Sequence, residues 1–450
     1  MSEGSAKKEE RCRFQAIKGV RDILPPESAL WNRVEQSARE VFATYGFGEI
    51  RLPIFEQTEL FARSVGEHTD IVSKEMYTFL SNVEPGSSEQ SVPTSSLSLR
   101  PEATASVVRA YIEHGMQMLP GNVKLYYVGP MFRRERPQKG RYRQFYQIGA
   151  EVLSHSGGLI EDARVDAEVI EMLMAFLAHV GLTQTTLHVN SIGHSAPECR
   201  RGYVARLRAE LLNVKDQLGA DSQRRIATNP LRVLDSKLPS EQETIAKLPH
   251  IADHLCEDCR KHYAELRAQL ALRGIAYEEN WRLVRGLDYY MRTTFEITAM
   301  GLGSQNAVCG GGRYDGLVEL LGGPLTKGIG FAIGTDRLVL SVQETALQGA
   351  RKVEAESGLA AYVAWMGDAA YPTAVRIAQV LRKAGLRVEL PAGDAKLGKS
   401  LGLADKLGAR YAVIVGENEV ASAEFVVKRL ADAEQKKVRE GELVAAVSGK

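Results

Sequence analysis

The sequence lacks the features that would place it in a membrane, in a secretory pathway or among the common nucleotide-binding folds. No stretch of its 450 residues is apolar for long enough to span a bilayer, and residues 1–13 are polar and mixed in charge, unlike a signal peptide. The sequence contains no Walker-type phosphate loop, no dinucleotide-binding fingerprint and no internal repeat. We therefore expect a cytoplasmic protein with no membrane contact that is neither an ordinary kinase nor a dehydrogenase.

Cysteine is scarce, and neither sign of charge dominates. The five cysteines are an odd number at irregular positions, which excludes a disulfide framework in a chain of this size and fits a reducing compartment. With 57 basic and 56 acidic side chains, the formal net charge is +1. The field of the whole protein therefore does not attract nucleic acid, and any RNA binding must come from local basic patches.

Two of the cysteines, Cys256 and Cys259, form a C-x-x-C pair of the kind that binds zinc. The other candidate ligands are His254, His262 and Cys199. However, we predict one continuous helix over residues 251–270, on which the two cysteines share a face and His254 points away. Because a second C-x-x-C pair is also missing, we expect no zinc.

The chain is long enough for roughly three domains. After an expected disordered leader at residues 1–13, strand and helix patterns run through residues 14–189 and return at residues 276–345. Residues 190–275 between them are charged and helical, and we interpret them as an insertion. In residues 359–450 apolar strands alternate with helices, which predicts a separate small α/β domain with parallel strands.

Cations, a carboxylate and aromatic residues are concentrated between Phe132 and Phe145. Arginine forks grip phosphate oxygens at two points, while Glu135 can accept a hydrogen bond from a base and Phe145 can offer it a ring face. Arg141 and Arg143 point to the same face of a predicted strand. This composition suits a nucleoside triphosphate. A solvated, salt-bridged hairpin is the plain alternative for the cluster, and a surface ion pair for Arg143.

A second group of polar residues suits a small polar ligand. Gln147 and Glu151 lie on one face of a predicted strand, so their side chains project together. Glu102 stands just before a predicted helix, where the helix dipole alone also favours a carboxylate. Arg285 follows a strand and precedes a glycine, so we expect its side chain at a strand end. Glycines 310–312 allow a close approach of backbone to a ligand, but a plain turn also uses such glycines.

Several of these segments together resemble the class II aminoacyl-tRNA synthetases. Tyr45–Ile54, Phe132–Arg136 and Gly328–Leu338 resemble, in this order, the first, second and third signature motifs of that class. Three further segments make the likeness specific to the histidyl-tRNA synthetase family, and they are Leu99–Thr104, Arg285–Tyr290 and Gly310–Leu317. The resemblance covers nearly the whole chain from about residue 17.

The resemblance implies an ATP-dependent ligase that needs Mg²⁺ and activates L-histidine through an adenylate. Catalysis would rest on Arg133 and Arg285, which would contact the α-phosphate, while Arg337 and Phe145 would flank the adenine. The implied ATP-binding residues are Arg133, Glu135, Arg141, Phe145 and Arg337. The implied histidine-binding residues are Glu102, Ala103, Thr104, Arg133, Gln147, Glu151, Arg285, Tyr289, Tyr290 and Tyr314.

The resemblance also implies a fold and partners. We expect an α/β protein whose catalytic core is an antiparallel sheet of class II type with flanking helices, a helical insertion, and a C-terminal anticodon-binding domain for tRNA(His). The first signature motif implies a homodimer. The pair Thr335-Asp336 and the residue Met291 depart from the commoner family pattern, which questions local geometry but not activity.

Two alternatives remain at this stage. The first is a histidyl-synthetase-like regulatory subunit of ATP phosphoribosyltransferase, which would bind histidine without charging tRNA. Such paralogues generally lose the C-terminal domain and residues equivalent to Arg285, both of which this chain retains. The second is a synthetase for another amino acid, which the segment Arg285–Tyr290 disfavours.

Overall fold

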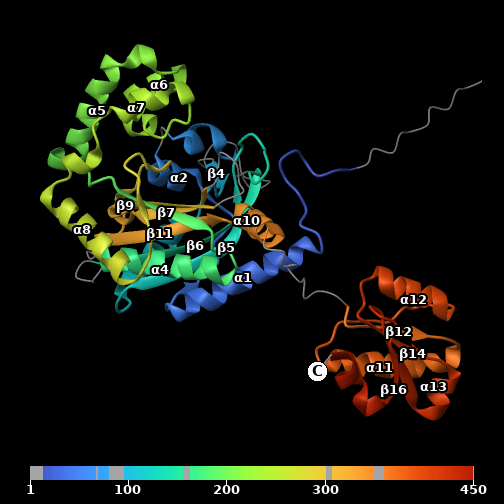
Figure 1. Cartoon of the computed structure of the whole chain (residues 1–450). Coiled ribbons are helices and arrows are strands. Elements are labelled where there is room, and N and C mark those ends of the chain that lie inside the picture. The colour runs from blue at the N-terminus through green and yellow to red at the C-terminus, as the bar shows by residue number, and fades with distance from the viewer. Residues whose placement is uncertain are drawn as a thin grey trace, which may run out of the picture. The chain divides into compact units, whose positions relative to one another are not determined.

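The computed structural model in Figure 1 describes residues 14–66, 69–80, 96–155, 163–299, 307–348 and 359–448. These residues form two compact units, divided within residues 349–358. The expected leader, residues 1–13, lies outside the described residues. Within the described ranges, no helix combines the length and apolar character needed to cross a bilayer.

The first unit is built on an eight-stranded sheet with the order β1-β5-β6-β11-β10-β9-β7-β8. Pairing is antiparallel from β5 through β7, and only the edge strands β1 and β8 pair in parallel. The strands are β1 (Gly48–Glu49), β5 (Val123–Phe132), β6 (Gln144–His155), β11 (Thr326–Gly334), β10 (Ala307–Arg313), β9 (Met291–Ala299), β7 (Thr185–Ser191) and β8 (Glu278–Glu279). Strand β6 lies between β5, at whose end the second signature motif begins, and β11, which contains most of the third, and Glu151 of β6 is opposite Gly330.

Helices α1 (Glu27–Thr44) and α4 (Ala163–His179) cover one face of this sheet, as Figure 1 shows. The buried apolar residues of α1 recur every three or four positions, which turns one side of the helix toward the sheet. Phe42 of α1 meets Phe331 of β11 edge to face, with ring centroids 5.9 Å apart. Each such buried ring stabilises the fold by about 1.5–3 kcal/mol. Helix α10 (Thr335–Gln348) follows β11 directly.

Smaller elements complete the core of the first unit. A three-stranded antiparallel sheet has the order β2-β4-β3. Its strands and the nearby helices are β2 (Phe55–Gln57), β3 (Thr78–Leu80), β4 (Ser96–Leu99), α2 (Thr58–Val65), α3 (Thr104–Glu113) and α9 (Leu317–Leu320), with the turns η1 (Ile71–Glu75) and η2 (Met116–Met118).

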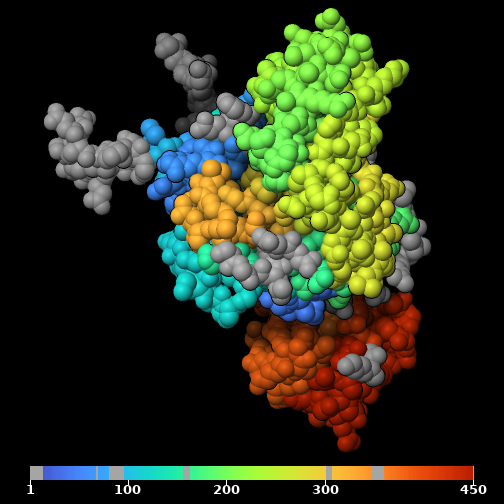
Figure 2. Space-filling view, turned by 90° about the vertical axis from the view of Figure 1, so that its left-hand side faces the viewer, coloured from blue at the N-terminus to red at the C-terminus, as the bar shows by residue number. Residues whose placement is uncertain are grey.

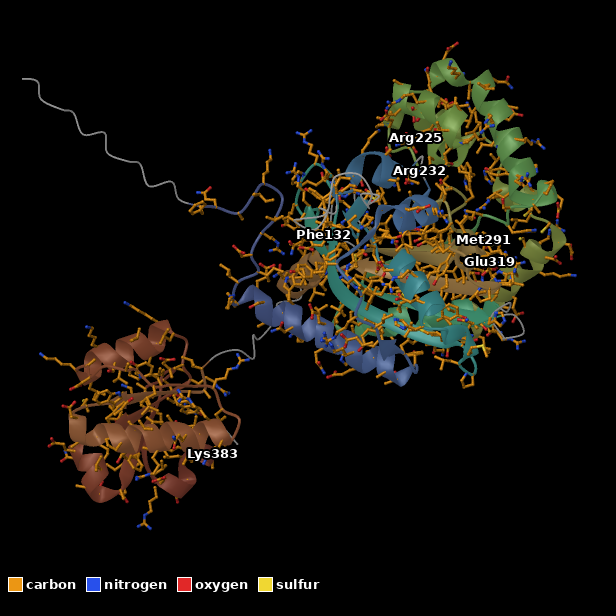
Figure 3. The ribbon with its side chains drawn as sticks, turned by 180° about the vertical axis from the view of Figure 1, so that it is seen from behind. Phe132, Arg225, Arg232, Met291, Glu319 and Lys383 are labelled. Atoms are coloured by element: carbon orange, nitrogen blue, oxygen red, sulfur yellow. The ribbon has the colours of Figure 1, made fainter. Side chains whose placement is uncertain are left out.

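The segment between β7 and β8 is helical, and its first part extends from the sheet as a lobe, coloured green to yellow in Figure 2, whereas its last helix packs against α4. Its helices are α5 (Gly202–Asn213), α6 (Ala220–Thr228), α7 (Gln242–Ala246) and α8 (Glu257–Leu272), joined by the short turns η4 (Pro197–Arg201), η5 (Lys215–Gln217), η6 (Pro230–Val233), η7 (Pro239–Glu241) and η8 (Ile251–His254). Figure 3 labels Arg225 and Arg232 on this lobe. Between them, Asn229 Nδ2 donates a 3.0 Å hydrogen bond to Asp288 Oδ1, so the lobe contacts the loop that contains Arg285.

The single helix predicted over residues 251–270 is wrong. A 3₁₀ turn ends at His254, the backbone is extended at Leu255 and Cys256, and α8 begins only at Glu257. Helical periodicity cannot detect such a break, because each half is helical by itself. The relative orientation of the cysteines and His254 that we inferred from one helix therefore does not hold.

The second unit has a five-stranded sheet with the order β13-β12-β14-β15-β16. Strands β12, β13 and β14 are parallel, as predicted, while β15 and β16 add an antiparallel hairpin. The elements are β12 (Ala361–Trp365), α11 (Tyr371–Lys383), β13 (Val388–Glu389), α12 (Leu397–Lys406), β14 (Tyr411–Val415), α13 (Glu417–Ser422), β15 (Glu424–Arg429), β16 (Gln435–Arg439) and α14 (Leu443–Ser448), with the turns η9 (Asp368–Ala370) and η10 (Glu440–Glu442). Its buried apolar residues form a core of their own.

Candidate active site

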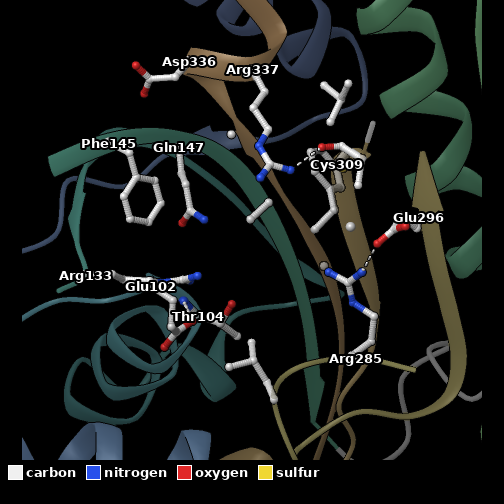
Figure 4. Close-up of a pocket in the computed structure, with 18 of the residues that line it drawn as sticks. Glu102, Thr104, Arg133, Phe145, Gln147, Arg285, Glu296, Cys309, Asp336 and Arg337 are labelled. Carbon is white, nitrogen blue, oxygen red and sulfur yellow. Dashed lines mark hydrogen bonds and ion pairs between the residues drawn. The ribbon is translucent and has the colours of Figure 1, made fainter. Parts of the chain in front are cut away.

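A pocket of ≈ 320 Å³ lies over the central strands β6, β11 and β10 of the first unit (Figure 4). Its walls come from segments far apart in the sequence, namely the start of α3, the strand pair β5–β6, the loop before β9, and the junction of β11 with α10. Arg337 enters the cavity from one end and Arg285 from the other, as Figure 4 shows.

The pocket brings together nearly all the predicted site residues. Those that line it are Glu102, Thr104, Arg133, Glu135, Arg141, Phe145, Gln147, Glu151, Arg285, Tyr289, Tyr290, Tyr314 and Arg337. Ala103 does not line it, because its methyl group is fully buried in the core at the start of α3. Arg143 is also outside the pocket, and its Nη1 donates to the carbonyl of Lys18 at 3.1 Å.

One end of the pocket is built around the buried carboxylate of Glu151. Its Oε1 accepts a 2.6 Å hydrogen bond from Thr104 Oγ1, and its Oε2 accepts a 2.7 Å bond from the Tyr314 hydroxyl. Burial raises the pKa of Glu151 to about 8. Gly330 makes this position possible, because a Cβ there would lie 1.7 Å from Glu151 Oε2.

Glu102 serves the helix terminus and the pocket together. Its carboxylate accepts hydrogen bonds from the backbone N–H groups of Thr104 at 2.7 Å and Ala105 at 3.0 Å, in the first turn of α3. The same side chain lines the pocket. Burial raises its pKa, and these N–H groups partly offset that effect.

Aromatic rings and one unpaired acceptor surround the carboxylates. The rings of Tyr289 and Tyr290 lie 4.7 Å apart, and Tyr314 meets Tyr289 edge to face at 5.8 Å. Gln147 is buried, and in the part of the chain that the structure describes its Oε1 has no hydrogen-bond partner. An unpaired buried acceptor is costly unless a ligand satisfies it. This end of the pocket therefore suits a small ligand that carries N–H donors.

Arg285 reaches the centre of the pocket across a glycine. Its Nη1 donates to Glu296 Oε2 of β9 at 3.0 Å. A Cβ at Gly310 would lie 2.0 Å from Arg285 Nη2, so only glycine leaves room for the guanidinium. Glycines 310–312 lie within strand β10, and the alternative of a plain turn is therefore wrong.

The opposite end of the pocket gathers cations around Phe145. The guanidinium of Arg133 lies 5.2 Å from the centre of the Phe145 ring, and Arg133 Nε donates to the carbonyl of Pro101 at 2.9 Å. Arg337 Nη1 donates to the carbonyl of Ala307 at 2.8 Å. Burial, together with the nearby charge of Arg141, lowers the pKa of Arg337. An anion placed among these arginines would relieve both the burial cost and the repulsion.

The sequence analysis missed three polar residues of the pocket, Tyr127, Glu296 and Asp336. Tyr127 projects from β5 over Gly149, where a Cβ would lie 2.3 Å from its hydroxyl. Alternation along β5 and β9 could have marked Tyr127 and Glu296 as facing the sheet surface, but only the strand register shows that this surface is the pocket.

The two departures from the family pattern have clear places in the structure. Asp336 is buried and accepts hydrogen bonds from the backbone N–H of Tyr146 at 3.1 Å and from Arg21 Nη2 at 3.2 Å, which ties α10 to β6. Met291 begins β9, is labelled in Figure 3, and does not line the pocket. Of these positions, only Asp336 lines the pocket.

Two arginines of the sequence motifs are structural. Arg313 is fully buried, where it pairs with Asp166 of α4 and donates to Asp315 Oδ1 at 3.2 Å. Arg100 Nη1 donates to the carbonyls of Leu52 at 2.9 Å and Pro53 at 3.1 Å, and its Nε donates to the carbonyl of Pro130 in β5 at 2.9 Å, which holds the first motif beside β5. These motifs therefore contain both pocket residues and the residues that position them.

Comparisons with known proteins agree with this geometry. The family model described as histidyl-tRNA synthetase matches residues 19–338, and the model described as anticodon binding domain matches residues 360–450. A curated histidine–tRNA ligase of Koribacter versatilis (strain Ellin345) is 54% identical over 430 residues, which is 96% of this chain and 95% of that protein. A histidine–tRNA ligase of Solibacter usitatus (strain Ellin6076) is 50% identical over 433 residues, 96% and 98% of the two chains. The crystal structure of apo S. aureus histidyl-tRNA synthetase is similar with a TM-score of 0.75 at 35% identity, covering 96% of this chain and 99% of that one. The predicted fold class is confirmed.

Proposed function

Because the chain belongs to the histidyl-tRNA synthetase family, as its motifs predicted, we propose that it ligates L-histidine to tRNA(His) at the expense of ATP. One observation is the main support for placing this reaction in the pocket. A single cavity joins a buried end of carboxylates and tyrosines to an end lined by arginines and Phe145. Activation of an amino acid by ATP requires these two environments side by side.

Histidine binds at the end that contains Glu102, Gln147 and Glu151. The free acceptor Gln147 Oε1 takes an N–H of the ligand, and Glu151, oriented by Thr104 and Tyr314, accepts from another. A competitor without ring nitrogens would leave buried polar groups unpaired, so such a site discriminates strongly. The tyrosine rings supply the remaining walls.

ATP binds at the opposite end, with its adenine between Phe145 and Arg337 and its α-phosphate near Arg133 and Arg285. The histidine carboxylate attacks the α-phosphate, and pyrophosphate leaves. Arg285, held over Gly310 by Glu296, stabilises the charge that develops on phosphate oxygens. No side chain of the protein acts as a nucleophile.

Mg²⁺ would supply positive charge to the phosphate groups of ATP during this step. Carboxylate oxygens are the ligands that Mg²⁺ prefers in proteins. The pocket offers such oxygens on Glu135, which lies 3.3 Å from Arg141 among the arginines assigned to ATP. Glu135 fits a role in holding the ion together with the phosphates.

The transfer step uses the second unit. By family likeness, the 3′-hydroxyl of the terminal tRNA ribose receives the histidyl group. The second unit matches an anticodon binding domain and has a core of its own, so residues 359–450 bind the anticodon end of tRNA(His). Residues 190–275 form the insertion domain of the catalytic part, residues 14–189 and 276–345.

A homodimer in the cytoplasm is part of this proposal. Ile54, Phe55, Phe79 and Leu80 expose 46%, 53%, 43% and 64% of their surface, next to the first signature motif. Adjacent exposed apolar residues of this kind indicate a protein interface. Replacing Phe55 and Phe79 with serine should shift the mass measured by light scattering toward the monomer, and an unchanged dimer would exclude this surface as the interface.

The alternative of a regulatory subunit is not favoured by the comparisons, since the relatives described above are named as ligases and the anticodon binding domain is present. An ATP–pyrophosphate exchange assay tests the proposed activity. Exchange should require histidine and Mg²⁺ together. Histidine binding without exchange would support the regulatory subunit, and exchange driven by another amino acid would reject the proposed substrate.

A further inference from the structure

Away from the pocket, the structure brings one histidine and three cysteines together. They are His194, Cys199, Cys256 and Cys259, and one ligand atom of each lies within 4.8 Å of those of the others. His194 and Cys199 follow β7 at the start of the insertion. Cys256 and Cys259 lie at the start of α8, which is the last helix of the insertion. The cluster therefore forms where the two ends of the insertion meet.

The local backbone explains how these side chains converge. The break before Glu257 leaves Cys256 extended as the N-terminal cap of α8 and places Cys259 in its first turn. On the other side, Gly193 has a positive φ of 62°, and a Cβ there would lie 2.6 Å from Cys199 Sγ. A side chain at position 193 would therefore displace the thiol from the cluster.

The distances within the cluster match a tetrahedral metal site. His194 Nδ1 lies 3.1 Å from Cys259 Sγ and 3.5 Å from Cys256 Sγ. Zinc bonds of about 2.3 Å to sulfur and about 2.0 Å to nitrogen would place nitrogen and sulfur roughly 3.5 Å apart, and two sulfurs roughly 3.8 Å apart. The two observed nitrogen–sulfur distances are close to this value, and no two of the four ligand atoms lie more than 4.8 Å apart.

The other candidate histidines from the sequence are excluded by their positions. The ring of His254 lies against Tyr203, with centroids 5.6 Å apart, and His262 Nε2 lies 3.4 Å from Asp166 Oδ2. Neither belongs to the cluster. The ligand missing from the sequence pattern is instead His194, which is 62 residues from Cys256 and could not be found by spacing.

We propose that His194, Cys199, Cys256 and Cys259 form a structural Zn²⁺ site. Three thiolates and one neutral imidazole are a common ligand set for structural zinc, and four protein ligands leave no open position for a substrate. The complex would carry one net negative charge, and the cations Arg200 and Arg292 interact with its thiols. This proposal replaces the expectation of no zinc, which rested on a continuous helix that the structure does not contain and on the lack of a second C-x-x-C pair, in whose place His194 and Cys199 supply the other two ligands.

The site would fasten the insertion to the wall of the histidine pocket. A guanidinium N–H of Arg200, the residue after Cys199, donates to the carbonyl of Tyr290. The backbone N–H of Arg292 donates to the carbonyl of Gly193 at 2.8 Å, next to His194. Loss of the metal would therefore loosen both ends of the insertion and the loop that carries the two tyrosines.

Metal analysis of the untagged full-length protein tests this proposal. Protein produced with added zinc and desalted should contain about one zinc per chain by elemental analysis. After exchange, Co²⁺ should give the intense visible bands of a tetrahedral ion with thiolate charge transfer. Cys256→Ser and His194→Gln should lose most of the zinc, whereas the matched controls Cys12→Ser and His254→Gln should retain it.

The contrary results are equally clear. Wild-type protein without zinc whose Co²⁺ spectrum shows no thiolate coordination would overturn the proposal, and so would equal zinc contents in Cys256→Ser and wild type. Reduced wild-type protein titrated with Co²⁺ decides the matter even if the variants do not fold. A disulfide within the cluster, detected by mass spectrometry of protein purified without reductant and persisting after zinc supplementation, would indicate a redox pair and reject the metal site.

Discussion

Replacement of Arg285 by alanine should slow histidine activation by about 10²–10³, or about 2.7–4 kcal/mol, the cost of removing one preorganised donor to developing charge. The structure places the loss toward the upper end of this range. Without Arg285, the carboxylate of Glu296, now 3.0 Å from its guanidinium, would be left unpaired beside the phosphates. Arg285→Lys should recover only part of the rate, because an ammonium cannot reproduce the planar fork.

Single-turnover formation of the adenylate, measured by rapid quench with α-labelled ATP, isolates this step from product release. Adding Glu296→Gln to Arg285→Ala should restore part of the rate by removing the unpaired charge. Arg282→Ala is the matched control, since Arg282 lies in the same loop but donates to Gln242 and does not line the pocket. An activation rate for Arg285→Ala equal to that of Arg282→Ala would refute the catalytic role.

Three further predictions follow from the geometry. Gly310→Ala should expel the guanidinium of Arg285, because the new Cβ would lie 2.0 Å from Arg285 Nη2. The rate of histidine activation by this variant should fall at least tenfold, while its melting temperature changes little. Normal kinetics would show that Arg285 acts from another position. Burial raises the pKa of Glu151 to about 8, so between pH ~4.5 and ~8 this carboxyl group ionises only in the unfolded protein. As the pH rises through this range, the free energy of unfolding of the wild type, measured with denaturant, should therefore fall by roughly 3–5 kcal/mol relative to that of Glu151→Gln. A difference between the two proteins that does not vary with pH would contradict that assignment. Deletion of the chain from Leu359 onward should leave pyrophosphate exchange largely intact while sharply reducing tRNA charging, since every residue assigned to ATP or histidine lies before Leu359. Equal tRNA charging by the truncated protein would reject the tRNA role of the second unit. Loss of both exchange and the dimer would indicate that the second unit has a structural role.

Local patterns in the sequence were sufficient for much of the pocket. Gln147 and Glu151 were expected to project together because they alternate along one strand, and both line the cavity from β6. Glu102 was expected at a helix terminus and is found there. Such predictions succeed because they depend only on the period of one element.

Other features depend on contacts between distant segments, which periodicity does not encode. The need for glycine at position 310 arises from Arg285, which belongs to another segment. The role of Glu296 requires the register of β9 against β10. The break at Cys256 accompanies contacts with His194 and Cys199, which lie 62 and 57 residues earlier. The antiparallel hairpin β15–β16 was missed for a different reason, since charged residues make up three of the six residues of β15 and three of the five of β16, which weakens the apolar pattern of a strand.

Charging of tRNA with labelled histidine tests the central claim most directly. Purified protein, ATP and Mg²⁺ should transfer histidine, and none of the other amino acids, to unfractionated tRNA, with the label recovered on the terminal adenosine after nuclease digestion. Arg285→Ala should remove this activity under the same conditions. Charging with a different amino acid, or adenylate formation with no transfer to any tRNA, would contradict the account.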